Sequence, residues 1–281
     1  MANRIKVITA KRAGFCFGVK RAVDMAFDAA KKSRCVYTLG PIIHNPQVID
    51  KLKAEGVRPV DSIDSPRIKT LIVRTHGVPK EVSDKLSRKK YDVIDATCPF
   101  VKKAQDHASL LKAEGYQVVI IGDREHPEVQ GLMSYAGPDV IVINKDDSIP
   151  RLKSRVGVVV QTTQPVSVLK KFVSDTIDKV KELKVYNTIC NSTALRLKET
   201  KEIAGEVDAV VVVGGKNSAN TTQLANFCIS MSVPTYHIET ASEIRKEWFM
   251  NVAKVGITAG ASTPDWIIEE VADRIRHLGG R

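Results

Sequence analysis

Three of the five cysteines in this 281-residue chain share the same local surroundings. Cys16, Cys98 and Cys190 each follow a short strand-like run and precede a helix-like stretch, and they are separated by 82 and 92 residues. Thiolates are ligands of soft metals and of iron–sulfur clusters, and an odd number of cysteines argues against a disulfide framework. We therefore expect these three to converge on one metal centre. Cys35 and Cys228 lack the shared surroundings and are expected to pack in the core.

The number of thiolates limits the kind of metal centre. A structural zinc ion normally takes four protein ligands, and a cubane [4Fe–4S] cluster usually takes four cysteines. No fourth cysteine stands at an equivalent position of the sequence. With three ligands, one iron of a cubane cluster would remain open to bind substrate as a Lewis acid. The spacing by itself leaves the identity of the metal open.

Glycines and polar residues recur at fixed distances from each cysteine. A glycine that ends an apolar run stands 24 positions on, at Gly40, Gly122 and Gly214. A polar residue that opens a helical pattern stands 28 positions on, at His44, His126 and Ser218. A second apolar run in each segment ends in a polar tip shortly before a proline, at His76, Thr162 and Ser262.

This repetition predicts an α/β fold made of three similar units in a pseudo-threefold (trefoil) arrangement. The predicted units are residues 15–98, 99–190 and 191–281, with an N-terminal strand in residues 1–14 associated with the third. Ligands of parallel sheets bind beyond the carboxyl ends of the strands. The arrangement would therefore bring the three cysteines to one centre, surrounded by helix N-termini and their polar tips.

The polar residues at these turns suit an anionic ligand. Helix N-termini bind phosphate through free N–H groups and the helix dipole. The net charge of +11 favours a diphosphate or an acidic protein partner. Lysine and arginine are scattered and no zinc-finger or RNP1 motif is present, which disfavours nucleic acid. Helix capping is the ordinary alternative role for serine and asparagine here. The predicted second layer of the site contains His44, His76, His126, Thr162, Ser218, Asn220 and Ser262.

One carboxylate stands close to these residues. Glu128 lies two residues after His126, in the first turn of a predicted helix. A carboxylate at such a position often does no more than complement the helix dipole. In a closed cavity it can instead serve as a proton donor, with Thr162 relaying or orienting the proton.

Eight segments together resemble one enzyme family. They are GFCFGVKRAV, HNPQV, THGVP, DATCPFV, HPEVQG, QTT, GGKNSAN and TAGASTPD, between residues 14 and 265. They are similar to the 4-hydroxy-3-methylbut-2-enyl diphosphate reductases, the last enzymes of the non-mevalonate isoprenoid pathway. The resemblance implies a [4Fe–4S] cluster on Cys16, Cys98 and Cys190. It implies catalytic roles for Glu128 as proton donor, for Thr162 at the substrate hydroxyl, and for His126. The residues implied to hold the diphosphate are His44, His76, His126, Ser218, Asn220 and Ser262.

The chain departs from the family at one binding position. The family commonly has Ser-Ser-Asn where this chain has Ser218-Ala219-Asn220. One hydroxyl donor is therefore missing, and Ala219 can contribute only a backbone contact to substrate.

The reaction implied by the resemblance is a two-electron reductive dehydroxylation that gives isopentenyl and dimethylallyl diphosphate. The implied partner is an acidic electron carrier, ferredoxin or flavodoxin, with its reductase. No apolar run approaches the length of about 20 residues that a membrane span needs. No signal peptide is recognisable either. We therefore expect a cytoplasmic enzyme with neither membrane nor nucleic-acid partners.

Two other functions remain open from the residues alone. A hydro-lyase with the same three-cysteine cluster would remove water without net redox chemistry, and it would turn over without a reductant. It should bind a carboxylate through arginine, and only Arg74 and Arg124 stand near the polar tips. A non-catalytic protein that binds phosphate ligands or RNA around a structural zinc would be colourless. A radical S-adenosylmethionine enzyme is disfavoured because no CxxxCxxC motif is present.

Overall fold

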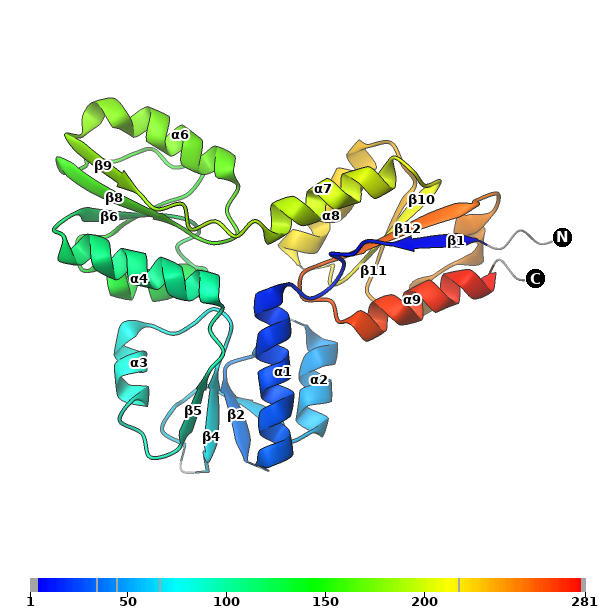
Figure 1. Cartoon of the computed structure of the whole chain (residues 1–281), viewed down its shortest axis with the longest axis horizontal. Coiled ribbons are helices and arrows are strands. Elements are labelled where there is room, and N and C mark those ends of the chain that lie inside the picture. Colours follow the sequence, from blue (N-terminus) through cyan, green and yellow to red (C-terminus); the bar gives the residue numbers. More distant parts are fainter. Residues whose placement is uncertain (1–4, 34, 44, 66, 217, 279–281) are drawn as a thin grey trace. The chain divides into compact units, whose positions relative to one another are not determined.

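The computed structural model describes residues 5–33, 35–43, 45–65, 67–216 and 218–278 of the chain (Figure 1). Over these residues the chain alternates short strands and helices. The strands are β1 (Lys6–Thr9), β2 (Val36–Leu39), β3 (Val57–Val60), β4 (Thr70–Val73), β5 (Asp92–Asp95), β6 (Gln117–Ile121), β7 (Ile141–Ile143), β8 (Arg155–Val160), β9 (Glu182–Val185), β10 (Ala209–Val213), β11 (Thr235–Ile238) and β12 (Lys254–Ala259). The α-helices are α1 (Phe17–Lys32), α2 (Pro46–Ala54), α3 (Lys80–Leu86), α4 (Pro99–Ala113), α5 (Pro127–Ala136), α6 (Val166–Thr176), α7 (Ser192–Ala204), α8 (Ala219–Ser230) and α9 (Asp265–Leu278). Short 3₁₀ turns are η1 (Ile177–Lys179), η2 (Ala241–Glu243) and η3 (Lys246–Phe249).

Across the described residues, the strands form three four-stranded sheets in which every neighbouring pair is parallel. The first sheet has the order β3-β2-β4-β5, the second β7-β6-β8-β9, and the third β11-β10-β12-β1. All three share one topology, provided that β1 counts as the last strand of the third sheet. β1 does pair with β12, with Lys6 opposite Lys254. The α/β class with three parallel sheets is confirmed.

The central strands are apolar because both of their faces are covered. All five residues of β10 are buried, and so are the last five residues of β8. Runs of valine and isoleucine are typical of parallel strands that are covered by helices on both sides. Several connecting helices begin with proline, as α2, α4 and α5 do, because the first turn of a helix does not need the missing N–H.

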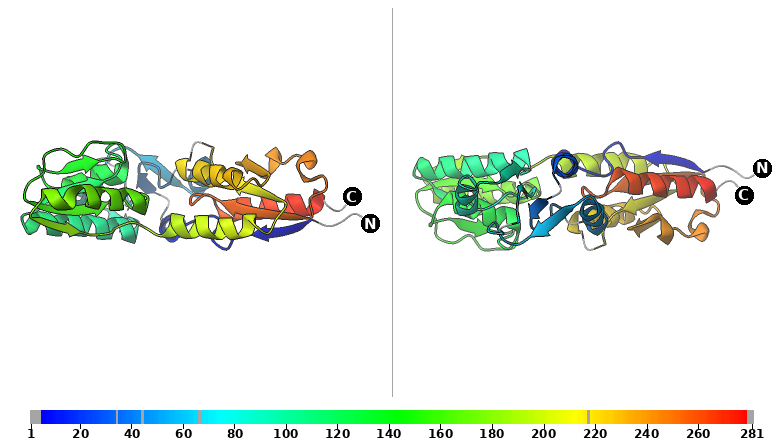
Figure 2. Two further views of the ribbon diagram at one scale, coloured as in Figure 1. Left: turned by 90° about the horizontal axis from the view of Figure 1, so that it is seen from above. Right: turned by 90° about the horizontal axis from the view of Figure 1, so that it is seen from below.

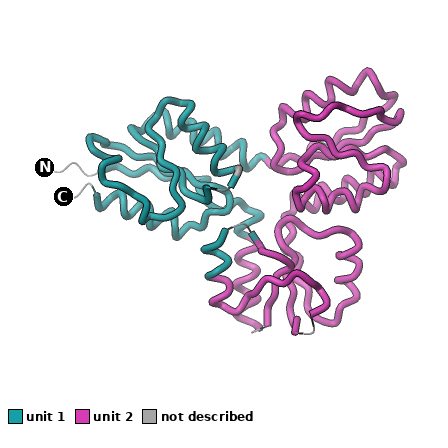
Figure 3. The backbone as a smooth tube through the Cα atoms, turned by 180° about the vertical axis from the view of Figure 1, so that it is seen from behind, with its two compact units in different colours: residues 1–20, 43–50, 191–281 teal, residues 21–42, 51–190 magenta. Residues whose placement is uncertain are grey.

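By its internal contacts the chain divides into two compact units (Figure 3). Unit 1 contains residues 1–20, 43–50 and 191–281, and it holds the third sheet. Unit 2 contains residues 21–42 and 51–190, and it holds the first and second sheets. This division runs through α1 and α2 rather than along the three boundaries expected from the repeat. The three-unit division therefore stays a prediction.

Each unit has its own apolar core. In unit 1, α9 lies beside β1 and buries Ile267, Val271 and Ile275 (Figures 1 and 2). In unit 2, Leu111 of α4 sits against β8 so closely that a Cβ added to Gly157 would lie 2.5 Å from its Cδ2 atom. Each fully buried aliphatic side chain contributes about 1.5–3 kcal/mol. None of the described helices combines the length and the apolar character that crossing a membrane requires.

Candidate active site

Each of the three cysteines follows the last strand of a sheet, and its backbone is tied to the turn after the neighbouring strand. The N–H of Cys98 donates to the carbonyl of Thr75 at 2.9 Å. In the same way Cys190 donates to Thr162 at 2.7 Å, and Cys16 donates to Ala261 at 3.1 Å. The topology thus joins the two sequence features that were expected to meet: each cysteine is fixed against the turn that carries a polar tip.

The three cysteines also stand at or next to helix N-termini. Cys98 is the N-cap of α4, the Cys16 carbonyl accepts from the N–H of Lys20 in α1, and Cys190 precedes Asn191, the N-cap of α7. The positive end of a helix dipole favours thiolate, the form in which cysteine binds metals. All three thiols are half-buried. Cys228, in contrast, is fully buried in an apolar cluster, and burial raises the pKa of its thiol to about 11.

Strand pairing shows which turn residues are equivalent. The N–H groups of Cys98, Cys190 and Cys16 reach Thr75, Thr162 and Ala261, so these three share one position of the turn. His76, Thr163 and Ser262 occupy the next position. Thr162 therefore stands one residue before the position of His76 and Ser262, although the pattern within the sequence predicted that the three are equivalent. The reason is that the first turn has one residue more before its helix than the other two have.

Two of the helices that follow the glycines are capped by residues of the predicted set. His126 is the N-cap of α5 and Ser218 is the N-cap of α8. His44 lies outside the described residues. The residue immediately before α2 is Asn45, whose Oδ1 accepts from the N–H of Val48 at 3.0 Å. Its Nδ2 donates to the carbonyl of Ser262, also at 3.0 Å.

Sequence reasoning missed Asn45, although a signal was present. Asn45-Pro46 aligns with His126-Pro127 when the proline, rather than the distance from the cysteine, is used as the reference. Counting from the first residue of each helix makes the second residues of α2, α5 and α8 equivalent. These are Gln47, Glu128 and Asn220, and only Glu128 can hold or release a proton.

Thr162 holds both oxygens of the Glu128 carboxylate. Its backbone N–H donates to Oε1 at 2.6 Å, and its hydroxyl donates to Oε2 at 2.8 Å. Glu128 is only 2% exposed. Burial raises the pKa of Glu128 above its ordinary value, and the two hydrogen bonds from Thr162 offset only part of this rise. The raised pKa favours the protonated form, which is the form that can donate a proton.

Two histidines complete the site within unit 2. The Nδ1 atom of His126 accepts from the N–H of Glu128 at 3.1 Å, so the neutral ring carries its hydrogen on Nε2. The rings of His76 and His126 meet edge to face, with centroids 5.4 Å apart. The structure therefore brings together four of the predicted residues: His76, His126, Glu128 and Thr162.

The other predicted residues belong to unit 1. The Ser218 Oγ accepts from the N–H of Thr221 at 3.4 Å, a long capping bond that the hydroxyl can exchange for a ligand. Asn220 is half-buried in the first turn of α8, which begins at Ala219. Ser262 follows β12, in the turn that Asn45 holds. The predicted anion-binding groups of unit 1 that the structure describes thus also lie at helix N-termini and strand ends.

The surroundings of Cys16 suit an anionic metal cluster. Arg196 is 3% exposed, and its Nε has no hydrogen-bond partner among the described residues. A buried cation is costly unless a negative charge compensates it. The electrostatic effect of Cys16 acts to raise the pKa of this guanidinium, against the effect of burial. Neither unit, over its described residues, holds by itself three or more His, Cys, Asp and Glu side chains spaced to bind a metal ion. Cys16 belongs to unit 1, whereas Cys98 and Cys190 belong to unit 2.

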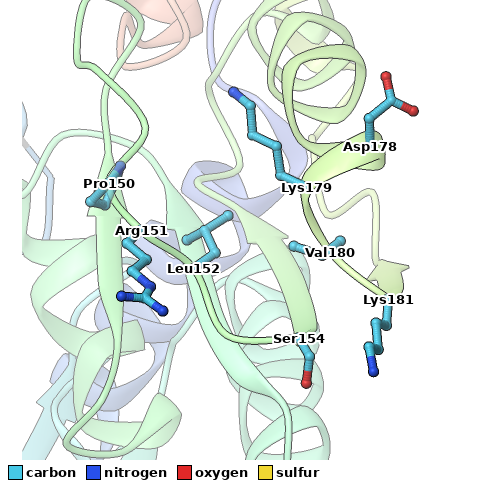
Figure 4. Close-up of a pocket in the computed structure, with 8 residues that line it drawn as sticks. All are labelled: Pro150, Arg151, Leu152, Ser154, Asp178, Lys179, Val180 and Lys181. Atoms are coloured by element: carbon cyan, nitrogen blue, oxygen red, sulfur yellow. The ribbon is translucent and has the colours of Figure 1, made fainter.

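A surface pocket elsewhere in unit 2 is unrelated to these residues (Figure 4). It has a volume of about 560 Å³ and is lined by Pro150, Arg151, Leu152, Ser154, Asp178, Lys179, Val180 and Lys181. These residues precede or join the starts of β8 and β9, whereas Thr162 and Cys190 follow the ends of the same strands. The pocket therefore lies at the opposite edge of the second sheet from the candidate site.

Comparisons with known proteins agree on one family. The sequence model described as LytB protein matches residues 7–276. The 4-hydroxy-3-methylbut-2-enyl diphosphate reductase of Pelobacter propionicus is 52% identical, with 98% of this chain and 99% of the relative covered. The enzyme of that name from Geobacter sulfurreducens is 49% identical, with 99% of both chains covered.

Solved structures give the same result. One is described as (E)-4-hydroxy-3-methyl-but-2-enyl diphosphate reductase, the terminal enzyme of the non-mevalonate pathway. It matches with a TM-score of 0.83 at 47% identity, over 97% of this chain and 99% of its own. The E-1-hydroxy-2-methyl-but-2-enyl-4-diphosphate reductase of Plasmodium falciparum matches with a TM-score of 0.80 at 26% identity, over 96% of this chain and 87% of its own. The chain described here therefore belongs to the LytB protein family.

Proposed function

We propose that this chain is an iron–sulfur oxidoreductase that converts 4-hydroxy-3-methylbut-2-enyl diphosphate to isopentenyl and dimethylallyl diphosphate. The observation that carries the proposal is the buried Glu128–Thr162 pair, with His126 and His76 beside it, in a chain about half identical to reductases of this name. A diphosphate needs several donors, and a hydroxyl that must leave needs a proton. The residues gathered at these strand ends can meet both needs.

Cys16, Cys98 and Cys190 are the residues that would hold a [4Fe–4S] cluster. Their half-buried thiols, their places at helix N-termini and the compensating cation Arg196 fit such an anionic group. When bound, the cluster would supply two electrons and an iron able to act as a Lewis acid toward the substrate hydroxyl.

The diphosphate is bound by the polar groups at the turns and helix N-termini. In unit 2 these are the rings of His76 and His126, with the hydrogen of the neutral His126 ring on Nε2. Helix N-termini add free backbone N–H groups, including those near Ala219 at the start of α8. The full proposed set is His44, His76, His126, Ser218, Ala219, Asn220 and Ser262. Neutral donors of this kind orient a dianionic group and exclude water around it.

Glu128 supplies the proton for the leaving hydroxyl. Burial raises the pKa of Glu128 and so favours the protonated carboxyl group, which can act as a general acid. Thr162 keeps this group in one orientation through its backbone N–H and its hydroxyl. The hydroxyl can rotate, so that it accepts the carboxyl proton on one side and donates its own to the substrate oxygen on the other. The oxygen then leaves as water, and two electrons and a second proton taken up by the carbon chain complete the product.

The electrons come from an acidic carrier, a ferredoxin or a flavodoxin with its reductase, in the cytoplasm. The net charge of +11 supports association with an acidic protein, because opposite charges steer the encounter.

Anaerobic turnover tests the function directly. Purified protein reconstituted with iron and sulfide is given the substrate and reduced methyl viologen. The expected result is formation of both isomeric diphosphates together with oxidation of two equivalents of the dye. Conversion of a hydroxy acid without any reductant would favour the hydro-lyase and contradict the proposal.

A further inference from the structure

The loop that leads to Cys16 is held by helix α7. Arg196 donates through Nη1 to the carbonyl oxygens of Arg12 and, at 2.7 Å, of Ala259. One turn further along the helix, the two carboxylate oxygens of Glu199 accept from the N–H groups of Lys11 and Arg12, each at 2.8 Å. Four hydrogen bonds from one helix thus fix the backbone between β1 and Cys16 against the end of β12.

A second arginine does the same for another cysteine. Arg21 of α1 donates through Nη1 to the carbonyl of Thr97 at 3.2 Å and through Nη2 to that of Asp95 at 3.3 Å. Thr97 directly precedes Cys98. Arg21 is the fifth residue of α1, and Arg196 is the fifth residue of α7. The same helical position therefore carries the same side chain with the same kind of partner in two lobes of the chain.

Helix α4, the third of the helices that follow the cysteines, differs from α1 and α7. The fifth residue of α4 is the exposed Lys103. Instead, the His107 ring stacks on Tyr186, which lies just after β9 in the segment leading to Cys190, with ring centroids 3.9 Å apart. All three cysteine-bearing segments are thus held by the helix packed on their own sheet, and arginine is used for two of them.

We propose that Arg196 and Arg21 are positioning residues of the cluster site, which hold the loops before Cys16 and Cys98 in the conformation that metal binding needs. The proposal rests on the three-cysteine cluster of the proposed function. A planar guanidinium suits this task because its fork of donors reaches two carbonyl groups at once, which an ammonium group does less well. Groups that orient metal ligands affect metal binding strongly although they do not touch the metal.

Arg196 brings a charge as well as hydrogen bonds. The acceptors of its hydrogen bonds are neutral carbonyl groups, and its Nε has no partner among the residues that the structure describes. Burial lowers the pKa of this guanidinium, while Cys16 and Glu199 act in the opposite direction. A cation held near a cluster ligand favours the more reduced, more negative state of the cluster. Loss of the Arg196 charge should therefore shift the reduction potential to more negative values.

The test compares Arg196→Met and Arg196→Lys in the full chain, with Lys198→Met as the matched control. Lys198 is exposed on the same helix, so its variant removes a charge of the same sign without touching the loop. After anaerobic reconstitution, the measurements are iron and sulfide per chain, the rate of cluster loss to a chelator, and the reduction potential. We expect Arg196→Met to lose the cluster about tenfold faster, with a more negative potential. Arg196→Lys should lose the cluster at an intermediate rate and keep a potential closer to that of the wild type. Lys198→Met should match the wild type in both measurements.

Arg21→Met and Arg21→Lys repeat the comparison in unit 2. They keep the proposal testable if Arg196→Met does not fold, because Arg21 is only partly buried. Wild-type rates of cluster loss in both methionine variants, with an unchanged potential in Arg196→Met, would overturn the inference. Wild-type protein that takes up no iron and sulfide would instead contradict the proposed function, so the two failures are distinguishable.

Discussion

The backbone N–H and the hydroxyl of Thr162 bind the two different oxygens of Glu128, at 2.6 and 2.8 Å. Thr75 occupies the equivalent position in the first sheet, where its hydroxyl donates to the carbonyl of Ile42 at 3.3 Å. Ala261, at the same position of the third sheet, has no hydroxyl. Among these three turns, the one after β8 alone holds a carboxyl group, and this asymmetry within a repeated fold supports the proposed role of Glu128 as proton donor.

Replacing Glu128 by glutamine should separate chemistry from binding. The amide keeps the size of the side chain and a hydrogen bond to Thr162, but it cannot donate a proton as an acid. We expect turnover to fall by about 10²–10⁴-fold, while cluster content and substrate affinity are retained. Single-turnover kinetics and iron and sulfide analysis measure these quantities. Glu125→Gln, at an exposed position of the same loop, is the control and should be fully active. Wild-type turnover of Glu128→Gln would remove Glu128 from the mechanism.

The Thr162 hydroxyl should set the pH range of activity. Its hydrogen bond favours the charged form of Glu128, so its loss in Thr162→Val should raise the pKa of Glu128 further. The basic limb of the kcat/KM profile should then move to higher pH, with a lower plateau because orientation is lost. Thr162→Ser keeps the hydroxyl and should retain the wild-type profile. An unchanged basic limb in Thr162→Val would show that another group controls the profile.

Glu128 should also make stability depend on pH in a defined direction. Its pKa is higher in the folded chain than the ordinary value of 4.5, so the folded state binds the proton more tightly than the unfolded state does. The contribution of this carboxyl group to the free energy of unfolding therefore decreases as the pH rises from about 4.5 through the raised pKa. We expect the unfolding midpoint of Glu128→Gln to exceed that of wild type near pH 8 and to match it near pH 4. Thermal unfolding of the cluster-free proteins measures the difference, and equal midpoints across this range would contradict it.

The sequence predicted the three parallel sheets because their central strands are short runs of valine and isoleucine between glycine and proline turns. Two equivalences within the repeat differ by one residue from those expected. Matching the polar tips by the proline that follows them aligned Thr162 with His76. Counting from the cysteines selected His44, which lies outside the described residues, and passed over its neighbour Asn45. A single extra residue in a loop shifts every later count, whereas the hydrogen bonds of paired strands fix the true correspondence.

The contacts of Arg21 and Arg196 could not have been predicted from local sequence. Both residues bind backbone carbonyls that are distant along the chain, from Arg21 to Thr97 and from Arg196 to Arg12. Any residue type offers a carbonyl group, so the identities of the partners carry no signal. Such contacts follow only from the packing of the helix on its sheet.

The three cysteines should be needed for the cluster, and Cys35 should not. Serine keeps the shape of the side chain but is a poor ligand for iron, so Cys16→Ser, Cys98→Ser and Cys190→Ser should each lose most of their bound iron and sulfide. Cys35→Ser is the matched control, since Cys35 is a half-buried free thiol without the shared surroundings. Absorbance and iron analysis under anaerobic conditions measure the content. Full iron and sulfide in Cys98→Ser would exclude it as a ligand.

The Asn45 side chain should contribute both to the stability of the fold and to substrate binding. Its side chain caps α2 through Val48 and holds the turn of Ser262 through Nδ2, so Asn45→Ala removes both hydrogen bonds. Loss of the cap should cost about 0.5–2 kcal/mol of unfolding free energy. If Ser262 binds the diphosphate, loosening its turn should also raise KM with little change in kcat. Asn45→Asp separates the two effects, because it keeps the capping oxygen and removes the donor to Ser262. It should unfold at nearly the wild-type denaturant concentration and still show the raised KM. A wild-type KM in Asn45→Asp would mean that this hydrogen bond does not position Ser262 for the substrate.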